Sequence, residues 1–166
     1  MPNDTIQSEL FNYFEQLATI AKNQGWKNDS EWTVGINEYL AHLGHKYGYI
    51  VHASGCKSAH SGWLYDHHWR EYSGDNILIR IPLVMEIEWG YGKTGIFEKV
   101  LYDFMKLVQS RADLRVMVFQ GNGIDNITDM LIQHVKHFDQ IQARDKYIFA
   151  GYGWDTTKMH CRLWSA

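Results

Sequence analysis

The feature that most constrains the fold of this chain is a run of apolar residues that contains two glutamates. Residues 77–89 are mostly branched or large apolar side chains, and Gly90 follows them, a pattern typical of a buried β-strand. Alternate residues of a strand project from the same face, so Glu86 and Glu88 should share one side, with their Cα atoms roughly 6.5 Å apart. Burying two like charges is costly unless a cation or hydrogen-bond donors receive them. A divalent metal is the simplest partner for this pair.

Apolar spacing and turn residues predict the other elements. Helices are predicted at residues 4–23, 30–47, 96–111 and 128–141, and Ser30 is the predicted N-cap of the second. Strands are predicted at residues 49–54, 63–72, 77–89, 114–119 and 147–150, with a further candidate at 160–164. Pro82 predicts a β-bulge or an edge position, because it cannot donate a backbone hydrogen bond. The glycines at 90, 92 and 95 match no phosphate-loop spacing and predict a turn or hinge. The order of elements indicates a mixed β-sheet flanked by helices, in one α/β domain that spans residues 1–166.

Charge and cysteine content restrict the classes of function. The formal net charge of −3 gives no global basic field, so a nucleic-acid partner would need a local basic groove or bound cations. Cys56 and Cys161 are far apart and in no metal-ligand spacing, which favours a reducing compartment. The N-terminus lacks a signal-peptide pattern, and no apolar stretch reaches about 18 residues. We therefore expect a cytoplasmic protein that does not span a membrane.

A third carboxylate accompanies the glutamate pair. Asp66 lies in the predicted strand that precedes the strand of Glu86 and Glu88, so pairing of these strands would bring Asp66 towards the glutamates. Carboxylates on adjacent strands form a hard-oxygen site suited to Mg²⁺ or Mn²⁺. Such a metal activates water and neutralises the charge of a phosphodiester, so phosphodiester hydrolysis is the reaction class that we expect.

Asp66 followed by Glu86-Ile87-Glu88 resembles the motif of the PD-(D/E)XK, or restriction endonuclease-like, superfamily. The resemblance covers residues 36–119: a helix, a strand, a strand with Asp66, the strand with both glutamates, a helix and a strand. It implies a restriction endonuclease-like core in which Asp66 and Glu86 bind the metal and help to position the attacking water. Glu88 stands where the motif usually has lysine, as in the E-X-E variant of some members.

Two further residues are candidates by the same resemblance. An acid on the first core helix often joins the site, and Glu38 is the nearest acid, but it falls opposite the apolar face of its helix and is expected in solvent. Asn37 is better placed but uncharged. Some members carry the lysine on the helix after the motif strand, and Lys106 is then the nominee. It lies opposite Phe104 and the other apolar residues of its helix, so we do not expect it at the site.

The glutamate pair also has a purely structural interpretation. Alternation of acids with apolar residues is typical of a half-exposed strand, and the acids could be solvated or paired with Arg80, Arg111 or Arg115. Against this, three consecutive apolar residues stand directly before Glu86, which indicates a strand covered on both faces.

The histidines and aromatic residues allow other interpretations. His67 and His68 beside Asp66 are compatible with zinc, but no other histidine falls at a helical or hairpin spacing that completes a site. The 7 Trp, 10 Tyr and 7 Phe residues fit a core or an interface better than a base-stacking surface.

The sequence therefore predicts a Mg²⁺-dependent nuclease-like protein of the endonuclease type. Asp66 and Glu86 would hold the metal and Glu88 would hold or orient the attacking water, which makes these three the predicted catalytic residues. The resemblance implies DNA as the substrate. Because 166 residues leave little room for a separate specificity domain, recognition would need a homodimer, accessory chains or the protein's own loops. The rival prediction is a catalytically inactive interaction module with the same fold, which the acidic balance, the missing motif lysine and the aromatic content favour. A third is a metal-dependent hydrolase of a small phosphorylated substrate.

Overall fold

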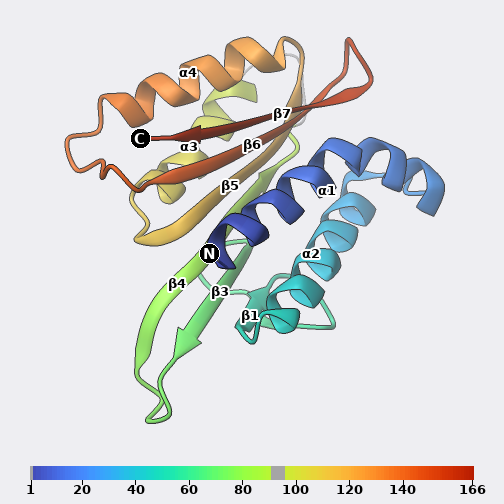
Figure 1. Ribbon diagram of the computed structural model, residues 1–166. Coiled ribbons are helices and arrows are strands. Elements are labelled where there is room, and N and C mark those ends of the chain that lie inside the picture. The colour runs from blue at the N-terminus through green and yellow to red at the C-terminus, as the bar shows by residue number, and fades with distance from the viewer. Residues whose placement is uncertain (1, 91–95) are drawn as a thin grey trace.

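Seven strands form one mixed β-sheet with helices on both faces (Figure 1), in a computed structural model that describes residues 2–90 and 96–166. The helices are α1 (Pro2–Gln24), α2 (Asp29–Lys46), α3 (Ile96–Val108) and α4 (Ile124–Lys136). The strands are β1 (Ile50–Ala53), β2 (His60–Ser61), β3 (His67–Tyr72), β4 (Leu78–Glu88), β5 (Ala112–Gly121), β6 (Lys146–Gly153) and β7 (Lys158–Ser165). The predicted α/β class and mixed sheet are confirmed. None of the helices in this part of the chain combines the length and hydropathy needed to cross a membrane.

The strand order is β2-β1-β3-β4-β5-β6-β7, so β4 lies in the middle of the sheet. Strands β4, β5 and β6 are parallel, and α3 and α4 make the crossovers between them. Strand β3 pairs antiparallel with β1 and β4, and β7 pairs antiparallel with β6. Because β4 has neighbours on both sides, its side chains can be buried on both faces, as its apolar composition predicts.

Two apolar layers cover the faces of the sheet. One face packs against α1 and α2, and β4 contributes Leu83, Met85 and Ile87 to it. The other packs against α3 and α4, and β4 contributes Val84. Since side chains alternate along a strand, Glu86 and Glu88 lie on the same side as Val84, facing α3. The apolar layers therefore direct both acids to the α3 side.

Several element boundaries differ from the prediction. Helix α2 begins at Asp29, because the Asn28 side chain caps it by accepting a 3.0 Å hydrogen bond from the Glu31 backbone amide; the predicted Ser30 cap is wrong. The strand predicted at residues 63–72 begins only at His67, because Leu64 has a positive φ of 72°, which interrupts the extended backbone.

The two later helices are shorter than predicted. Helix α3 ends at Val108 and α4 ends at Lys136, since residues 109–111 and 137–141 turn away towards β5 and β6. Helix α4 also begins earlier than predicted, directly after Gly123, whose φ of 64° suits glycine. The turn or hinge predicted around the glycines at 92 and 95 lies outside the described residues.

The β-bulge predicted for Pro82 is confirmed. The register of β3 with β4 shifts between Trp69↔Leu83 and Glu71↔Arg80, so β4 has one extra residue across this interval, which contains Pro82. Beyond the bulge the β3–β4 hairpin projects past the helices (Figure 1).

Candidate functional site

The predicted acids meet α3 in the interior of the sheet. Glu86 is only 1% exposed and pairs in register with Met117 of β5, while Glu88 is partly buried beside Phe119. Helix α3 passes over this face, and from it Asp103 and Lys106 reach the acids. The structure therefore places four charged residues, from one strand and one helix, in a common site.

Lys106 is the cation of this site. Its Nζ lies 2.9 Å from Glu86 Oε2 and 2.9 Å from Asp103 Oδ1. The expectation that Lys106 points away from the acids is wrong. The helical wheel places Lys106 opposite the apolar face of α3, but the long flexible stem of a lysine lets its ammonium group reach Glu86. Asp103, three residues earlier, was missed, although a charged pair at this spacing is a recognisable helical signal.

Glu86 is held in an environment that disfavours its charge. Burial raises the pKa of Glu86 to about 8, even though the hydrogen bond from Lys106 lowers it, and the nearby Asp66 carboxylate raises it further. The second oxygen, Oε1, is buried and has no hydrogen-bond partner among residues 2–90 and 96–166. A buried carboxylate oxygen without a donor is unusual and favours either a proton or a cation at that atom.

Glu88 lies at the carboxyl end of β4. Its Oε1 accepts a 2.6 Å hydrogen bond from the backbone amide of Gly90. Burial raises the pKa of Glu88; the Gly90 amide lowers it, whereas a hydrogen bond and charge repulsion from Asp103 raise it. A like charge beside a carboxylate disfavours its ionised form, so the Asp103 carboxylate makes Glu88 a better proton acceptor.

Asp66 approaches the glutamates from just before β3. Its Oδ2 accepts a 2.9 Å hydrogen bond from the backbone amide of Ile87, between the two glutamates. Its own carbonyl accepts a 3.1 Å hydrogen bond from Ser54, which continues the β1–β3 pairing. Although it is not in the strand proper, Asp66 is thus anchored against β4.

The donor chemistry of this site suits a hard cation, but its present geometry does not enclose one. Within residues 2–90 and 96–166, no three Asp, Glu, His or Cys side chains are gathered in a way that could hold a metal ion. Asp66 and Glu86 offer carboxylate oxygens, which Mg²⁺ and Mn²⁺ prefer. Lys106, however, neutralises the Glu86 oxygen that a metal would share. A metal at this site would therefore have to compete with the ammonium group of Lys106.

Two of the three arginines considered as partners of the acids, Arg80 and Arg115, are paired with other acids, and the third, Arg111, lines a cavity away from the acids. Arg80 Nε lies 2.6 Å from Glu71 and its Nη1 lies 2.9 Å from Asp113. Arg115 Nη1 lies 3.2 Å from Asp145. The prediction of a half-exposed, arginine-paired strand is therefore wrong for Glu86, because α3 covers this face.

His67 has a structural role. Its Nδ1 lies 3.2 Å from the Asn37 Oδ1, and its Nε2 accepts a 2.9 Å hydrogen bond from the Trp69 indole. Burial lowers the pKa of His67 to about 3, so the ring is neutral. Both nitrogens are used within the core. The zinc interpretation therefore loses its first ligand.

His68 and Glu38 also lie outside the acid cluster. The His68 ring is buried, makes no hydrogen bond with the described residues and stacks on His52 with ring centroids 4.9 Å apart. Glu38 accepts hydrogen bonds of 2.9 Å from the Lys57 amide and 2.5 Å from the Ser58 hydroxyl. Glu38 was expected in solvent, but its carboxylate instead holds the loop that precedes β2.

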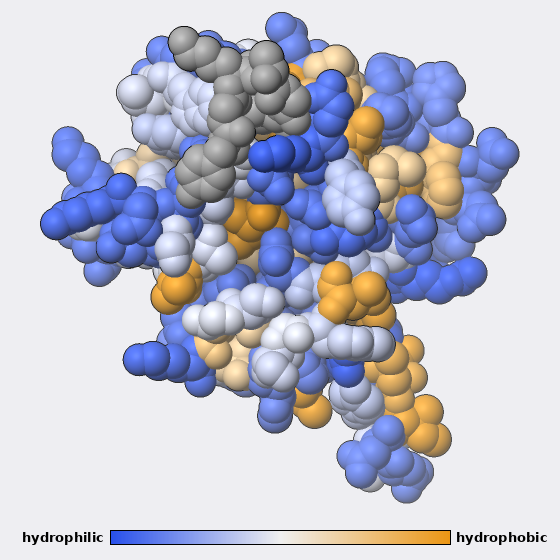
Figure 2. Space-filling view, turned by 180° about the vertical axis from the view of Figure 1, so that it is seen from behind, coloured by the Kyte–Doolittle hydropathy of each residue, from blue (hydrophilic) through white to orange (hydrophobic). Residues whose placement is uncertain are grey.

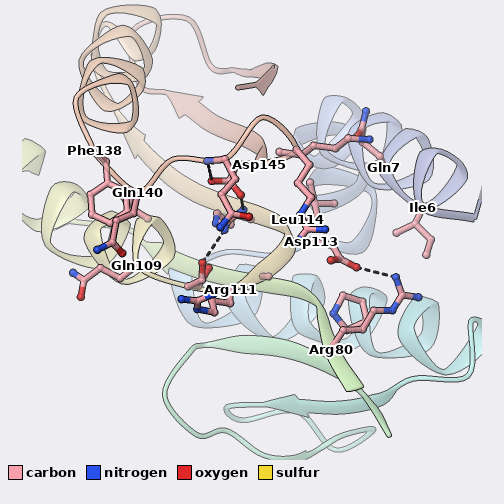
Figure 3. Close-up of a pocket in the computed structure, with 18 of the residues that line it drawn as sticks. Ile6, Gln7, Arg80, Gln109, Arg111, Asp113, Leu114, Phe138, Gln140 and Asp145 are labelled. Carbon is pink, nitrogen blue, oxygen red and sulfur yellow. Dashed lines mark hydrogen bonds and ion pairs between the residues drawn. The ribbon is translucent and has the colours of Figure 1, made fainter. Parts of the chain in front are cut away.

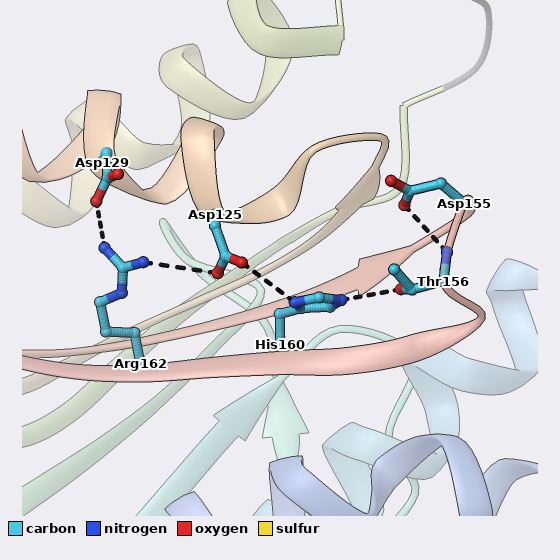
Figure 4. Close-up of polar contacts among 6 residues, drawn as sticks. All are labelled: Asp125, Asp129, Asp155, Thr156, His160 and Arg162. Atoms are coloured by element: carbon cyan, nitrogen blue, oxygen red, sulfur yellow. Dashed lines mark hydrogen bonds and ion pairs between the residues drawn. The ribbon is translucent and has the colours of Figure 1, made fainter.

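A second polar cluster, which no sequence pattern predicted, lies where β7 packs beside α4. Figure 4 shows His160 between Asp125 and Thr156, with Nε2 2.9 Å from the Thr156 hydroxyl and Nδ1 3.6 Å from Asp125. Arg162 pairs with both Asp125 and Asp129. The two aspartates are 68% and 65% exposed, so this is a solvated ion-pair network that joins the strand to the helix.

No family model matches the chain, and no curated protein or solved structure matches it either.

The raised pKa of Glu86 predicts a pH dependence of stability. In the unfolded chain the carboxyl titrates at its ordinary pKa of 4.5, whereas in the folded protein it holds its proton to about pH 8. The folded state therefore binds more protons between these values, and the free energy of unfolding should fall as pH rises through this window. In metal-free buffer, urea denaturation from pH 5 to pH 8 should show a loss on the order of 2–3 kcal/mol that Glu86→Gln lacks.

The comparison with Glu86→Gln isolates this residue. Burial lowers the pKa of both His67 and His68, to about 3 and 4, so these rings weaken the fold as pH falls below about 6.5, in both proteins alike. Parallel pH profiles for the two proteins would show that Glu86 is charged throughout this range.

Proposed function

We propose that this protein is a metal-dependent phosphodiesterase of the nuclease type, with DNA as its substrate. The observation that carries the proposal is the contact of Lys106 with Glu86, beside Asp66 and Glu88. Together these residues supply the acid, acid and lysine of the PD-(D/E)XK pattern, with the lysine provided by the helix that follows the motif strand. The motif strand has Glu88 where lysine is usual, and Lys106 would supply the missing lysine.

The order of elements supports the same proposal. The helix α2, the strands β1, β3 and β4, the helix α3 and the strand β5 occur in the order on which the resemblance rests, with only the short β2 added. The two acids lie towards the carboxyl end of the central strand, and α3 crosses to a parallel neighbour. A restriction endonuclease-like core is consistent with this arrangement.

Each residue has a role in the proposed reaction. Asp66 and Glu86 would hold Mg²⁺ or Mn²⁺, which supplies an activated water and neutralises phosphate charge. Lys106 would leave Glu86 for the substrate phosphate and stabilise the charge that develops on it. Glu88, whose pKa burial and Asp103 raise, would accept the proton of the attacking water.

Calorimetric titration of Mn²⁺ tests the metal site. Wild-type protein should bind Mn²⁺ in the presence of a short DNA duplex, whose phosphates draw Lys106 away from Glu86. Glu86→Ala should weaken this binding by roughly 100-fold or more, because it removes a direct ligand. The matched control is Glu98→Ala, which removes an exposed acid from the first turn of α3 and should bind as the wild type does.

The same titration decides the alternative, an interaction module without activity. That alternative is favoured by the ammonium group that already neutralises Glu86 and by exposed apolar residues on the β3–β4 hairpin. Ile77, Leu78 and Ile79 are 64%, 46% and 58% exposed there, and Figure 2 shows apolar residues along the projecting hairpin. Absence of Mn²⁺ binding with the duplex present would reject the enzyme and leave the interaction module.

A further inference from the structure

A cavity of about 650 Å³ lies near the amino ends of β5 and β6, away from the carboxyl end of β4 where Glu88 lies (Figure 3). Its walls come from the start of α1, the residues between α3 and β5, and the segment between α4 and β6. The volume falls within the usual range for binding sites of small organic molecules. The cavity is therefore large enough for a ligand rather than for water alone.

The charges that line the cavity are unequal. Its cations are Arg80, Arg111, Arg115, Arg144 and Lys146, and its acids are Asp4, Asp113 and Asp145. Each acid is paired with one of these cations: Arg80 lies 2.9 Å from Asp113, Arg115 lies 3.2 Å from Asp145 and Lys146 lies 3.0 Å from Asp4. This leaves two cations, Arg111 and Arg144. Neither side chain makes an ion pair or a hydrogen bond within the described residues. The cavity is therefore positively charged in a protein whose net charge is −3.

A buried arginine makes this wall rigid. Arg115 is 3% exposed, and it donates a 3.1 Å hydrogen bond from Nε to the Leu107 carbonyl and a 2.7 Å hydrogen bond from Nη2 to the Ser110 carbonyl. These bonds fix the residues between α3 and β5, including the backbone that carries Arg111. The positive wall is thus formed before any ligand arrives, which lowers the entropic cost of binding.

The rest of the lining is suited to an organic group. Gln109, Gln140 and Gln142 provide amides that can donate and accept hydrogen bonds, and Phe138 is a partly buried ring (Figure 3). A few polar groups around an apolar surface are typical of sites that orient a small molecule.

We infer that this cavity binds a small organic phosphate monoester, with Arg111 and Arg144 contacting the phosphate. A phosphate monoester carries a charge of about −1.5 to −2 at pH 7, which matches two uncompensated guanidinium groups. Guanidinium groups bind phosphate oxygens through paired N–H donors. The site uses none of the residues of the acid cluster, so it does not depend on the proposed nuclease function.

Calorimetric titration at low ionic strength tests the site, with adenosine 5′-monophosphate and inorganic phosphate as probes. Wild-type protein should bind adenosine 5′-monophosphate more tightly than inorganic phosphate, because Phe138 and the amides contact only the organic part. The double variant Arg111→Ala/Arg144→Ala should weaken binding of both by roughly tenfold or more. Both arginines are exposed, so the variant should keep the denaturation midpoint of the wild type.

The control variant also removes two positive charges, but at positions away from the cavity. Lys22→Ala/Lys27→Ala changes two exposed lysines near the far end of α1 and should bind both probes as the wild type does. The inference is overturned if wild-type protein binds neither probe, if the two probes bind equally, or if the control loses as much affinity as the arginine variant. As a second measurement, adenosine 5′-monophosphate should shift the NMR amide signals of residues 109–112; shifts confined to other regions would also overturn it.

Discussion

Lys106→Met should reduce Mg²⁺-dependent cleavage of DNA by roughly 100-fold or more, since it removes a preorganised charge from the site of phosphate chemistry. The substitution should leave the fold intact. Lys106 is 36% exposed, and methionine preserves the apolar stem that lies along α3. Without the ammonium group the Glu86 carboxyl should retain its proton to still higher pH, because the hydrogen bond from Lys106 is what lowers its pKa.

Lys136→Met is the matched control for this experiment. Lys136 also lies in the last turn of its helix, α4, and is exposed, so its loss should change cleavage less than twofold. Rates should be measured with supercoiled and short duplex DNA at saturating Mg²⁺. An unchanged cleavage rate in Lys106→Met would show that the lysine only neutralises Glu86 and has no part in catalysis.

Trp69→Ala should produce the largest loss of stability, about 3–5 kcal/mol in the free energy of unfolding. The Trp69 side chain is fully buried, and its ring packs 5.6 Å from that of Tyr49. It also lies against Gly44 of α2, where a Cβ atom would approach the indole nitrogen to 2.8 Å. The substitution leaves a cavity between sheet and helix, and it deprives His67 of the donor to its Nε2.

Trp63→Ala is the control, because it makes the same tryptophan-to-alanine change at an exposed position. Trp63 is 66% exposed and contacts Arg70 through a cation–π interaction, with the guanidinium 4.9 Å from the ring. Its removal should cost less than about 1 kcal/mol. Urea denaturation of both variants measures the difference, and equal losses would contradict the conclusion that Trp69 stabilises the fold by filling the space between the sheet and α2.

The elements of the fold were largely predictable because each carries a local signal. The apolar run of β4, the continuous apolar residues of β5 and the amphipathic pattern of α1 all predicted their element types correctly. The predicted boundaries are wrong where a single local contact decides where an element begins, as at the Asn28 cap of α2. They are also wrong where one residue adopts an unusual backbone, as at Leu64 before β3.

The acid cluster was only half predictable. The spacing of Glu86 and Glu88 shows that they share a face, and strand order brings Asp66 near them. The contact of Lys106 with Glu86 could not be predicted from the sequence of α3, because the helical wheel places Lys106 opposite the apolar face of the helix. Its contact depends on how α3 lies across β4 and on the length of a flexible side chain, and both are properties of the assembled protein.

By itself, then, the sequence determined the α/β class, the central position of the β4 segment and the identity of the carboxylates, because hydrophobic periodicity and alternation are local. Only the tertiary structure decided which groups surround those carboxylates. It covered Glu86 with α3, gave it Lys106 instead of an arginine, and left one of its oxygens without a donor from the part of the chain that the structure describes. It also gathered Arg111 and Arg144 around one cavity. Such contacts join residues that are far apart in the chain, so no local pattern records them.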